Sequence, residues 1–513
     1  QESQKDSLIR KFGELVTYID QLYVDDVDKK KIVDKAIVSM LDELDPHSVY
    51  IPSDEVQRSN ERIVGSFVGI GVRFQIYKDT LLVIHPTPGG PSYKLGILPG
   101  DKIIKIDKET VAGTGLKNSG VRKRLLGDKG SVVQVSILRK GERKLLDFDI
   151  TRDKIPLYSV VAKYMADDET GYIKLTSFSR TSHAEIKQAI TELKAKGMKN
   201  LVLDLQNNGG GLLWSAKNIS DEFLSGDKLI VYSEGKSQPR RDLKAGDHAN
   251  TGVWEQGKLV VLINEHSASA SEIVSGAVQD WDRGLIVGRR SFGKGLVQRP
   301  IDLSDGSQIR LTIARYFTPS GRFIQKSYED KEAYENDYLN RYLHGEFSSR
   351  DSIHLADSLL RHTLITKREV YGGGGIMPDY FVPIDTTGIS DLYKDINRKG
   401  LINSFILNHI NNNRKKLELE YSDLESFKNN FIVDKVFFKR FLEKAKEAEI
   451  EISEADLKES KSLIKLRLKA GLAQNLFEDA SYYEIMNVEN SALVEALDLI
   501  KSKKYDASKL AKN

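Results

Sequence analysis

The sequence predicts a multidomain protein of the α+β class, with helical regions on either side of a small β-rich domain and a layered α/β domain. The chain has 513 residues, which is long enough for three or four domains at roughly 150 residues each. The spacing of apolar residues changes from a helical to a strand-like period near residue 65, and strands alternate with helices after residue 154. Beyond about residue 386 the chain is rich in Lys, Glu and Leu, which favour helices.

Composition and charge exclude several classes of protein. Lys and Arg number 77 and Asp and Glu 74, so the net charge is +3, and 40% of the residues are apolar. A nearly balanced charge argues against a dedicated nucleic-acid binder, which clusters basic side chains against phosphates. The apolar content argues against a largely disordered chain. Because the chain has no cysteine, thiol nucleophiles, disulfides and iron–sulfur clusters are excluded, and a nucleophile would have to be Ser, Thr, Lys or a carboxylate.

The first 153 residues are expected to form a helical region and a β-rich domain. Apolar residues follow a period near 3.6 over residues 7–44, so residues 1–64 are interpreted as mainly helical, with a break at Asp45-Pro46-His47-Ser48. Residues 65–153 carry short apolar runs separated by glycine and proline, which is typical of strands. The expected strands are 67–75, 81–85, 102–106, 132–138 and 145–151.

Residues 154–385 are expected to form the α/β domain, and residues 386–513 a helical domain. Strand-like runs occur at 172–175, 201–205, 259–263 and 285–287, and helix-like runs at 182–196, 212–224 and 270–281. This alternation favours a sheet of parallel strands between helices. Residues 308–317 and 323–325 return to a strand pattern, and a charged, Tyr-rich stretch at about 328–370 is interpreted as an insertion.

Two loops of the α/β domain have the composition of a catalytic site. Asp204–Gly211 and Asn264–Glu272 each leave a strand-like run and enter a helix-like run. If the strands are parallel, both loops lie at their carboxyl ends, where open α/β sheets bind ligands. Free N–H groups at the helix starts suit an anionic oxygen, and glycines let a substrate approach the backbone. Together the loops are similar to an oxyanion hole beside a serine.

The serine at position 269 has two interpretations. Ser269 and Glu272 match the S-x-x-E capping box, and caps are far commoner than nucleophiles. A nucleophile would need a base, and His266 is poorly placed only three residues away. Lys294 would lie at the same edge of the sheet and could act as a base if it is desolvated, although a lysine between two glycines is ordinarily an exposed turn residue.

The segment around Lys294 also matches the first part of a phosphate-binding loop. Residues 288–294 fit G-x-x-x-x-G-K, but Gly295 stands where that motif has the Ser or Thr that binds magnesium. The residues after Gly295 have a strand pattern, whereas the motif requires a helix. Nucleotide binding is therefore not expected, and we expect no metal or other cofactor.

Residues 264–298 closely resemble the carboxy-terminal processing (tail-specific) serine proteases. They contain S-A-S-A-S-E at 267–272 and S-F-G-K-G at 291–295, and the lysine lies 25 positions after the middle serine. The resemblance implies that Ser269 is the nucleophile, Lys294 the general base and Gln298 its supporting residue. Straight strand would separate Gln298 from Lys294 by about 13 Å, so their contact requires the chain to turn at Gly295.

The resemblance extends to the glycine loop and to an acidic residue. It implies that the amides of Gly210 and Ala270 form the oxyanion hole, in a loop where Gln206 and Gly209 replace the arginine and proline of the family. Asp280 matches an acidic position that is sometimes counted as catalytic. Eleven residues of helix would place it about 16 Å from Ser269, so Asp280 is interpreted as a supporting, structural residue.

The resemblance covers about residues 5–385 and implies a PDZ domain before a layered protease core of the ClpP/crotonase type. Residues 66–152 are similar to a PDZ domain, with Gly69-Ile70-Gly71-Val72 at the position of its carboxylate-binding loop. The amides of Ile70, Gly71 and Val72 would bind the C-terminal carboxylate of a peptide. An ordinary tight turn between strands is the alternative.

We therefore expect a serine endopeptidase that uses a Ser–Lys dyad and recognises protein substrates by flexible C-terminal tails, with no nucleic-acid partner. A PDZ-bearing scaffold or chaperone with an inactive protease fold is the alternative. A lyase or isomerase on a related fold would need a coenzyme site that the sequence does not show. The resemblance implies a periplasmic location in the bacterial cell envelope, with which the absence of an initial Met and the loss of a signal peptide would agree. A homo-oligomer is left open.

Overall fold

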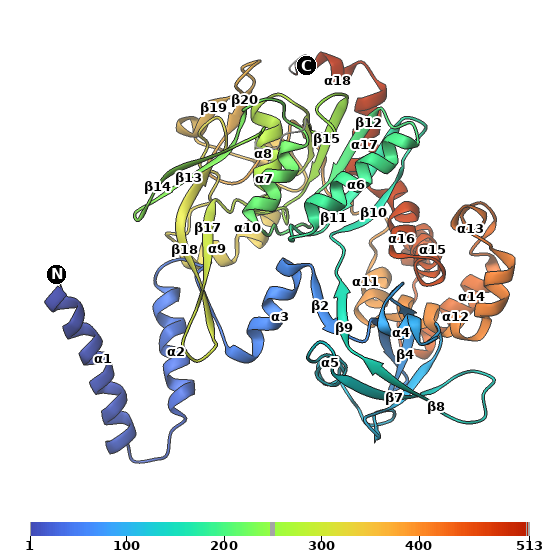
Figure 1. Ribbon diagram of the computed structural model, residues 1–513. Helices are drawn as coiled ribbons and strands as arrows, with labels where there is room; N and C mark the ends of the chain where they lie inside the picture. Colours follow the sequence, from blue (N-terminus) through green and yellow to red (C-terminus); the bar gives the residue numbers. More distant parts are fainter. Residues whose placement is uncertain (1, 247–251, 509, 511–513) are drawn as a thin grey trace.

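The computed structural model describes residues 2–246, 252–508 and 510. Figure 1 shows the chain passing from N-terminal helices through a small β domain into a large α/β domain, and then into a C-terminal set of helices. Within the described ranges, no helix is both long and apolar enough to cross a membrane.

The N-terminal region contains three helices and one short strand. Helix α1 (Glu2–Leu22) projects away from the body, and α2 (Lys29–Asp42) returns toward it (Figure 1). Strand β1 (Val49–Ile51), which the sequence pattern did not predict, precedes α3 (Ser53–Val64) and pairs antiparallel with β18 (Gln308–Phe317) of the α/β domain. The N-terminal region is thereby attached to the domain that carries the candidate catalytic residues.

The β domain is built on a sheet in the order β3-β4-β5-β7-β8, with β6 beside β5. Its elements are β2 (Ser66–Gly69), β3 (Val72–Tyr77), β4 (Thr80–Pro86), α4 (Pro91–Lys94), β5 (Lys102–Ile106), β6 (Glu109–Thr110), α5 (Asn118–Leu125), β7 (Val132–Leu138), β8 (Leu146–Thr151) and β9 (Asp153–Pro156). The single strand expected at 67–75 is wrong, because the chain leaves β2 through Ile70 and Gly71. Gly71 has a φ of 70°, which interrupts strand geometry and lets β2 pair with β9 while β3 pairs with β4.

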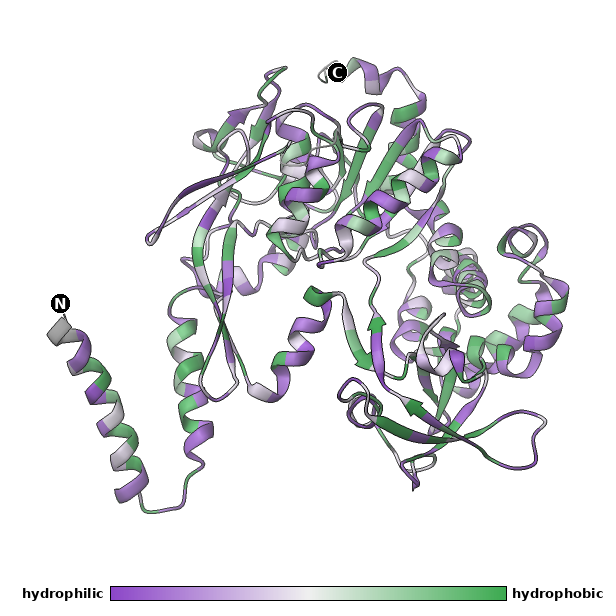
Figure 2. Cartoon of the chain, in the orientation of Figure 1, coloured by the Kyte–Doolittle hydropathy of each residue, from purple (hydrophilic) through white to green (hydrophobic). Residues whose placement is uncertain are grey.

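The α/β domain contains the parallel sheet that the sequence predicted. Its strands, in spatial order, are β10 (Val160–Met165), β11 (Thr170–Leu175), β12 (Asn200–Asp204), β15 (Lys258–Ile263), β16 (Leu285–Gly288) and β21 (Tyr380–Phe381). All neighbouring pairs are parallel except β10 with β11. Figure 2 shows the central strands as strongly apolar, as expected for strands that are covered on both faces.

Helices from two distant parts of the chain cover the two faces of this sheet. One face packs against α6 (Ser182–Ala195), α7 (Leu213–Asp221) and α8 (Ala270–Asp280). The other face packs against α17 (Ser491–Lys501) near the end of the chain. Alternate residues of β12 show this division, because Leu201 and Leu203 belong to the first core and Val202 to the second. The core on the second face of the α/β sheet is therefore completed by the C-terminal region.

A second sheet carries the segment that follows Lys294. Its order is β1-β18-β13-β14, with β17 (Leu296–Asp302) also paired to β18. The other two strands are β13 (Leu229–Gly235) and β14 (Gln238–Lys244). The strand expected at 323–325 is wrong, since only Phe323 forms an isolated bridge there. The backbone of this segment pairs with a loop instead, since the Gly373 N–H donates to the Phe323 carbonyl and the Gly375 N–H to the Ile324 carbonyl.

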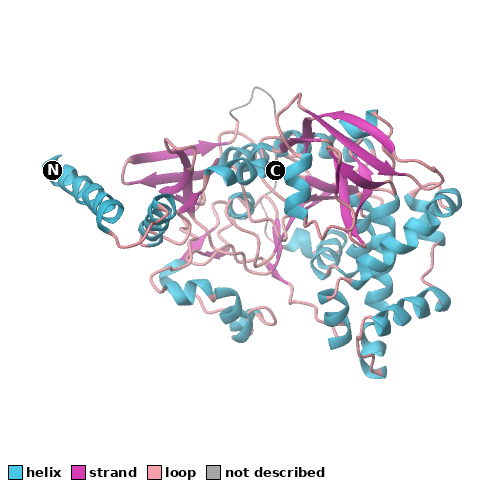
Figure 3. Ribbon diagram, turned by 90° about the horizontal axis from the view of Figure 1, so that it is seen from below, coloured by secondary structure: helices cyan, strands magenta, loops and turns pink. Residues whose placement is uncertain are grey.

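The insertion and the C-terminal region complete the described chain. The insertion contains α9 (Lys331–Glu335), α10 (Asp337–Leu343), two short 3-10 turns, β19 (Leu360–His362) and β20 (Glu369–Tyr371). The C-terminal helices are α11 (Asp391–Arg398), α12 (Leu401–Glu420), α13 (Leu424–Asn430), α14 (Lys435–Glu447), α15 (Glu454–Leu476), α16 (Asp479–Met486), α17 and α18 (Lys504–Ala507). Figure 3 shows α1 and most of these helices at opposite ends of the molecule.

The C-terminal helices also contact the β domain. Leu407 of α12 packs on Leu82 and Ile84 of β4, and the Tyr77 hydroxyl donates to the Asn408 side-chain oxygen at 2.8 Å. Because α17 packs on the α/β sheet at the same time, the C-terminal region connects the two other domains.

Candidate active site

The two candidate loops meet at the carboxyl edge of the parallel sheet, as the sequence predicted. The glycine loop follows β12 and the serine loop follows β15, and these strands are direct parallel neighbours. The Asn207 N–H donates to Asn264 Oδ1 at 2.8 Å, and Asn264 Nδ2 donates to Asn207 Oδ1 at 2.9 Å. This reciprocal pair joins the start of one loop to the start of the other.

Asn208 anchors the glycine loop to the serine loop. Its side chain is fully buried, and its backbone carbonyl accepts the Ala268 N–H at 3.0 Å and the Ser271 hydroxyl at 2.8 Å. The side-chain amide donates to the Leu175 carbonyl at 2.9 Å. These bonds hold the loop even though Gly209 replaces the proline of the family. Sequence reasoning assigned Asn208 no role, because an asparagine in a glycine-rich loop is an ordinary turn residue.

Gly210 lies directly beside the candidate nucleophile. Its φ is 99°, and a Cβ at this position would lie 2.7 Å from the Ala268 carbonyl oxygen, 2.8 Å from Ser269 Cβ and 2.9 Å from the Ala270 nitrogen. Gly210 and Ala270 are thus close together, as an oxyanion hole requires. The Gly210 N–H, however, donates to Asn208 Oδ1 at 3.0 Å, so a substrate oxygen would have to replace that partner.

Ser269 occupies a strained position at the start of α8. It is the N-cap residue, with a φ of 56° and a ψ of −112°, a conformation that is uncommon for a residue with a side chain. The capping box predicted from S-x-x-E is present. Strain of this kind concentrates at functional sites, and a sharp strand-to-helix turn exposes the serine of many hydrolases. The helix cap at Ser269 is therefore compatible with the nucleophile hypothesis.

The Glu272 carboxylate joins the serine segment to the lysine segment. The side chain is fully buried and accepts the Ser269 N–H at 2.7 Å and the Lys294 N–H at 2.9 Å, both on Oε2. Its Oε1 accepts the Ser291 hydroxyl at 2.5 Å and the Gly293 N–H at 2.7 Å. Burial raises the pKa of Glu272, and these four donors oppose that shift. Sequence reasoning recognised only the half of this arrangement that caps the helix.

Tyr316 also connects the serine segment to the lysine segment, through a backbone carbonyl of each. It lies on β18, is 1% exposed, and its hydroxyl is within hydrogen-bond distance of the backbone oxygens of Ser269 (3.1 Å) and Lys294. Burial holds the pKa of Tyr316 well above its ordinary value, so the hydroxyl keeps the proton that it donates.

Lys294 is desolvated, as the dyad hypothesis requires. Burial lowers the pKa of Lys294, while Asp45 and Glu272 oppose this shift through their charges. The amine donates to Gln298 Oε1 at 3.0 Å. The structure thus brings Lys294 and Gln298 together, and the register of β17 against β18 shifts between Val297 and Gln298 rather than at Gly295. The separation calculated for a straight strand does not apply across this irregularity.

The opposite end of α8 carries Asp280, far from Ser269. Asp280 is fully buried and ion-paired with the equally buried Arg322. It also accepts the Ser320 N–H at 2.8 Å and the Ser320 hydroxyl at 2.7 Å. These contacts agree with the structural interpretation of Asp280.

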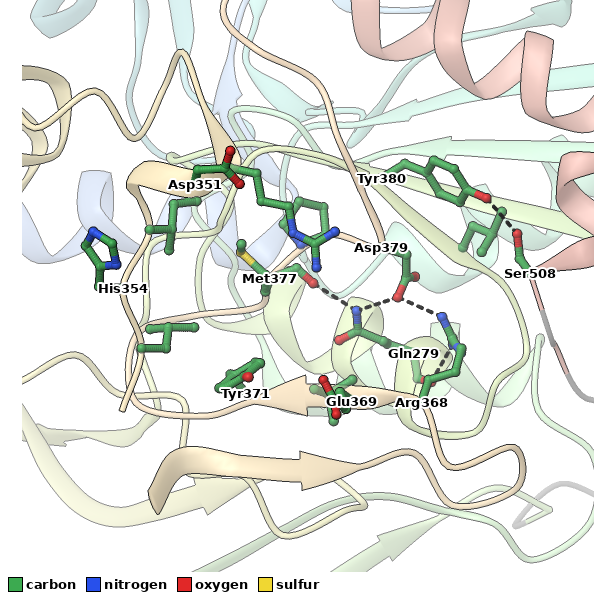
Figure 4. A pocket seen from close by; sticks show the side chains of 16 residues that line it. Gln279, Asp351, His354, Arg368, Glu369, Tyr371, Met377, Asp379, Tyr380 and Ser508 are labelled. Atoms are coloured by element: carbon green, nitrogen blue, oxygen red, sulfur yellow. Dashed lines mark hydrogen bonds and ion pairs between the residues drawn. The ribbon is translucent and has the colours of Figure 1, made fainter. Parts of the chain in front are cut away.

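A cavity of about 590 Å³ lies near this end of α8, between the sheet edge and the insertion (Figure 4). Gln279 Nε2 donates to Asp379 Oδ1 at 3.0 Å, and Arg368 donates to the same oxygen at 2.7 Å. The lining residues come from the far end of α8 and from the insertion, so the cavity is separate from the dyad.

The remaining sequence-predicted residues lie elsewhere. Ile70 and Gly71 are buried and Val72 is half-buried in the β domain, at the start of β3. Strand β3 is the edge strand of its sheet, the position at which a peptide can add as a further strand. His266 is half-exposed and stacks on Tyr338 with ring centroids 5.3 Å apart.

The phosphate-binding loop considered for residues 288–295 is not formed. Strand β17, and not a helix, follows Gly295, so the helix N-terminus of a phosphate-binding loop is missing there. No group of three or more acidic or histidine side chains that could hold a metal ion occurs among the described residues.

The layered core, the serine at a strained helix start, the desolvated lysine and the adjoining β domain together define a serine peptidase with a peptide-binding domain. Family comparison agrees. The model for peptidase family S41 matches residues 169–332, the model for PDZ domains matches residues 68–150, and the model for a family of unknown function (DUF8443) matches residues 392–478.

Sequence comparison then identifies the family. The chain is 37% identical over 324 residues to the carboxy-terminal-processing protease of Bartonella bacilliformis, covering 62% of this chain and 72% of that relative. It is 34% identical over 329 residues to the carboxy-terminal processing protease CtpB of Bacillus subtilis, covering 63% and 67%. The chain therefore belongs to the carboxy-terminal processing proteases, and the predicted family, fold class and serine-type peptidase activity are confirmed.

Among solved structures, the photosystem II D1 C-terminal processing protease is 33% identical, covering 60% of this chain and 82% of that chain, with a TM-score of 0.34. The relatives are named as proteases, and nothing in these comparisons favours the inactive scaffold.

We expect Gly210→Ala to lower kcat by about 100-fold, the order found when one oxyanion donor is lost. The added Cβ would clash with backbone atoms of the serine loop. Gly209→Ala is the control for a side chain added to the same loop, because a Cβ at Gly209 meets nothing within 4 Å. Steady-state kinetics on an unfolded protein substrate would measure both variants. Equal activity of the two would show that the close approach of Gly210 to Ser269 does not matter.

Proposed function

We propose that this peptidase cleaves peptide bonds with a dyad of Ser269 and Lys294. The observation that carries the proposal is the shared carboxylate of Glu272, which holds the backbone N–H groups of both residues on a single oxygen. Burial lowers the pKa of the Lys294 amine, which favours the neutral form that a general base needs.

In this mechanism, neutral Lys294 accepts the proton of the Ser269 hydroxyl as Ser269 Oγ attacks the carbonyl carbon of the scissile bond. The carbonyl oxygen becomes an oxyanion. The Lys294 ammonium then returns the proton to the leaving amine, and an ester to Ser269 remains. A water molecule, deprotonated by Lys294, attacks the ester, and collapse of the second intermediate releases the acid and returns the proton to Ser269.

The oxyanion would be bound by the amides of Ala270 and Gly210. Ala270 is the first residue of α8, so its N–H has no carbonyl partner within the helix. The Gly210 N–H would exchange Asn208 Oδ1 for the substrate oxygen. Gln298 would keep the Lys294 amine directed toward Ser269 through the 3.0 Å bond from that amine to its Oε1.

Ser269→Ala and Lys294→Met are each expected to lower kcat by about 10⁴-fold or more, because each removes a group that takes part in bond making. Cleavage of an unfolded protein substrate would measure the loss, and circular dichroism would verify the fold. Lys236→Met, at an exposed lysine, is the control. A fluorophosphonate should label the wild type and not Ser269→Ala. A Lys294→Met enzyme with wild-type activity would exclude the lysine from the dyad.

Activity should depend on the ionisation of Lys294. Only the neutral amine can accept a proton, so kcat/KM should rise with pH as the Lys294 ammonium is deprotonated. Burial lowers the pKa of this lysine from 10.5, and the half-maximal point of the rise should therefore lie below pH 10.5. A kcat/KM profile over the neutral and alkaline range would measure it, and a half-maximal point at or above 10.5 would contradict a desolvated base.

We further propose that the substrates are proteins with flexible C-terminal tails, whose terminal carboxylate is bound by the amides of Ile70, Gly71 and Val72. The place of this loop before the edge strand β3 supports the proposal. The tail would extend the sheet along β3 while its carboxylate occupies the loop.

Amidation of the C-terminus of a tail peptide should therefore raise KM about ten-fold or more, since it removes charge-assisted hydrogen bonds. Gly71→Ala should have a similar effect. Both Gly71 and Gly89 have a φ of 70°, but a Cβ at Gly71 would lie 2.9 Å from Ile155 Cδ1 and one at Gly89 would meet nothing within 4 Å. Gly89→Ala is thus the matched control. An unchanged KM for the amidated peptide would contradict carboxylate recognition.

Location and assembly are two further proposals. We propose the periplasm as the place of action, on the basis of the family resemblance. Recovery of the native protein only with a cytoplasmic marker after osmotic shock would contradict this location.

We propose a homo-oligomer joined through α1, which exposes an apolar row at helical spacing: Leu8, Phe12, Leu15 and Leu22. Sedimentation of a monomer at micromolar concentration would contradict the oligomer.

A further inference from the structure

Gln298 is held at both ends of its side-chain amide. Its Oε1 accepts the Lys294 amine at 3.0 Å, and its Nε2 donates to the backbone carbonyl of His47. A glutamine amide has one acceptor end and one donor end. The His47 carbonyl can pair only with the donor end, so it leaves the oxygen facing Lys294. If the amide were reversed, its N–H groups would face the Lys294 amine and its oxygen would face the His47 carbonyl, and the hydrogen bond to that carbonyl could not form.

The His47 carbonyl belongs to a turn that the buried Asp45 holds together. Asp45 Oδ1 accepts the His47 N–H at 2.8 Å and the Ser48 N–H at 2.9 Å, and Oδ2 accepts the Ser48 hydroxyl at 2.7 Å. An aspartate that binds the N–H groups of the next residues fixes a turn locally. The direction of the His47 carbonyl therefore follows from the Asp45 side chain.

The same turn is anchored to the strand that lies beside Gln298. The Thr312 N–H donates to Ser48 Oγ at 3.1 Å, and the Thr312 hydroxyl donates to Asp45 Oδ1 at 3.1 Å. Thr312 is also the residue paired with Gln298 in the β17–β18 ladder. One residue of β18 thus sets the position of the turn and of the glutamine together. Strand β1, which continues the turn, pairs with β18 from Val49 onward.

The charged groups near the Lys294 amine have opposing effects on its pKa. Burial lowers the pKa of Lys294 most, Asp45 and Glu272 raise it, and Arg310 lowers it further. Burial, and then the charge of Lys294, lower the pKa of His47 to about 4. The turn therefore places an uncharged imidazole near the amine at neutral pH, with His47 Nε2 2.7 Å from the Tyr334 hydroxyl.

We propose that Asp45-Pro46-His47-Ser48 positions the catalytic lysine, because Asp45 and Ser48 hold the His47 carbonyl that orients the Gln298 amide toward Lys294. The inference rests on the proposed Ser269–Lys294 dyad. Asp45 and Ser48 act through Gln298 and are positioning residues. The N-terminal region thereby supplies a part of the active site that the α/β domain lacks.

A double-mutant cycle in the full chain tests this coupling. Asp45→Ala and Gln298→Ala should each lower kcat, by up to about 100-fold for a misplaced catalytic group, with KM nearly unchanged. With kcat taken on the plateau of the pH profile, where the effect of the Asp45 charge on the pKa of Lys294 no longer enters, the double variant should lose no more than Gln298→Ala alone. Asp45→Asn should recover part of the activity, since its Oδ1 can still accept both N–H groups.

Two further variants keep the test decisive. Ser48→Ala removes one anchor of the turn without removing a charge, and it should lower kcat by a smaller factor than Asp45→Ala. In the Gln298→Ala background it should have no effect. This second cycle replaces the first if Asp45→Ala does not fold. Glu43→Ala, at an exposed residue just before the turn, is the control and should retain wild-type kcat.

Losses that multiply in the double variants would overturn the inference, because the turn would then act independently of Gln298. That result would leave the dyad intact, since Ser269→Ala and Lys294→Met test it separately. Full activity of Lys294→Met would instead overturn the proposed function.

Discussion

The buried carboxylate of Glu272 is the interaction on which the candidate active site depends. Removing a carboxylate from water is costly unless donors replace the lost hydration. Glu272 has four such donors, which belong to Ser269, Ser291, Gly293 and Lys294. Hydrogen bonds to a charged group contribute about 1.5–3 kcal/mol each, so the burial is stable only while all of these segments stay in place. Glu272 therefore holds the serine and lysine loops together, and Tyr316 adds a second connection through their carbonyls.

The desolvation of Lys294 requires walls from distant parts of the chain. Lys294 is bonded to Glu272 of α8 through its N–H, to Tyr316 of β18 through its carbonyl and to Gln298 of β17 through its amine. A lysine exposed to water would keep its ordinary pKa and would be protonated at neutral pH. Its value as a base therefore depends on the tertiary structure around it. The C-terminal helix α17 stabilises this arrangement indirectly, since it covers the second face of the sheet from which both loops emerge.

Much of this organisation could be predicted from local patterns. Apolar runs predicted β12, β15 and β16, their alternation with helices predicted parallel pairing, and parallel pairing brought the two loops to one edge. Prediction of strands from these patterns was wrong where the backbone forms its hydrogen bonds with segments that are distant in sequence. Residues 323–325 have a strand pattern but pair with loops, and β1 is too short for its sequence to identify without its partner β18.

The sequence by itself determined the family, the fold class and the residue types of the site, because motif spacing and periodicity are properties of the chain. Only the tertiary structure decided which groups serve each candidate. The sequence predicts that Glu272 caps a helix, and in the folded chain its carboxylate also accepts the Lys294 N–H. The contact between Lys294 and Gln298 is accompanied by a register shift in β17, and the Gly210 N–H has a side-chain acceptor that the motif spacing did not reveal. Hydrogen-bond partners and burial are set by residues remote in sequence, and they become definite only when the whole chain is folded.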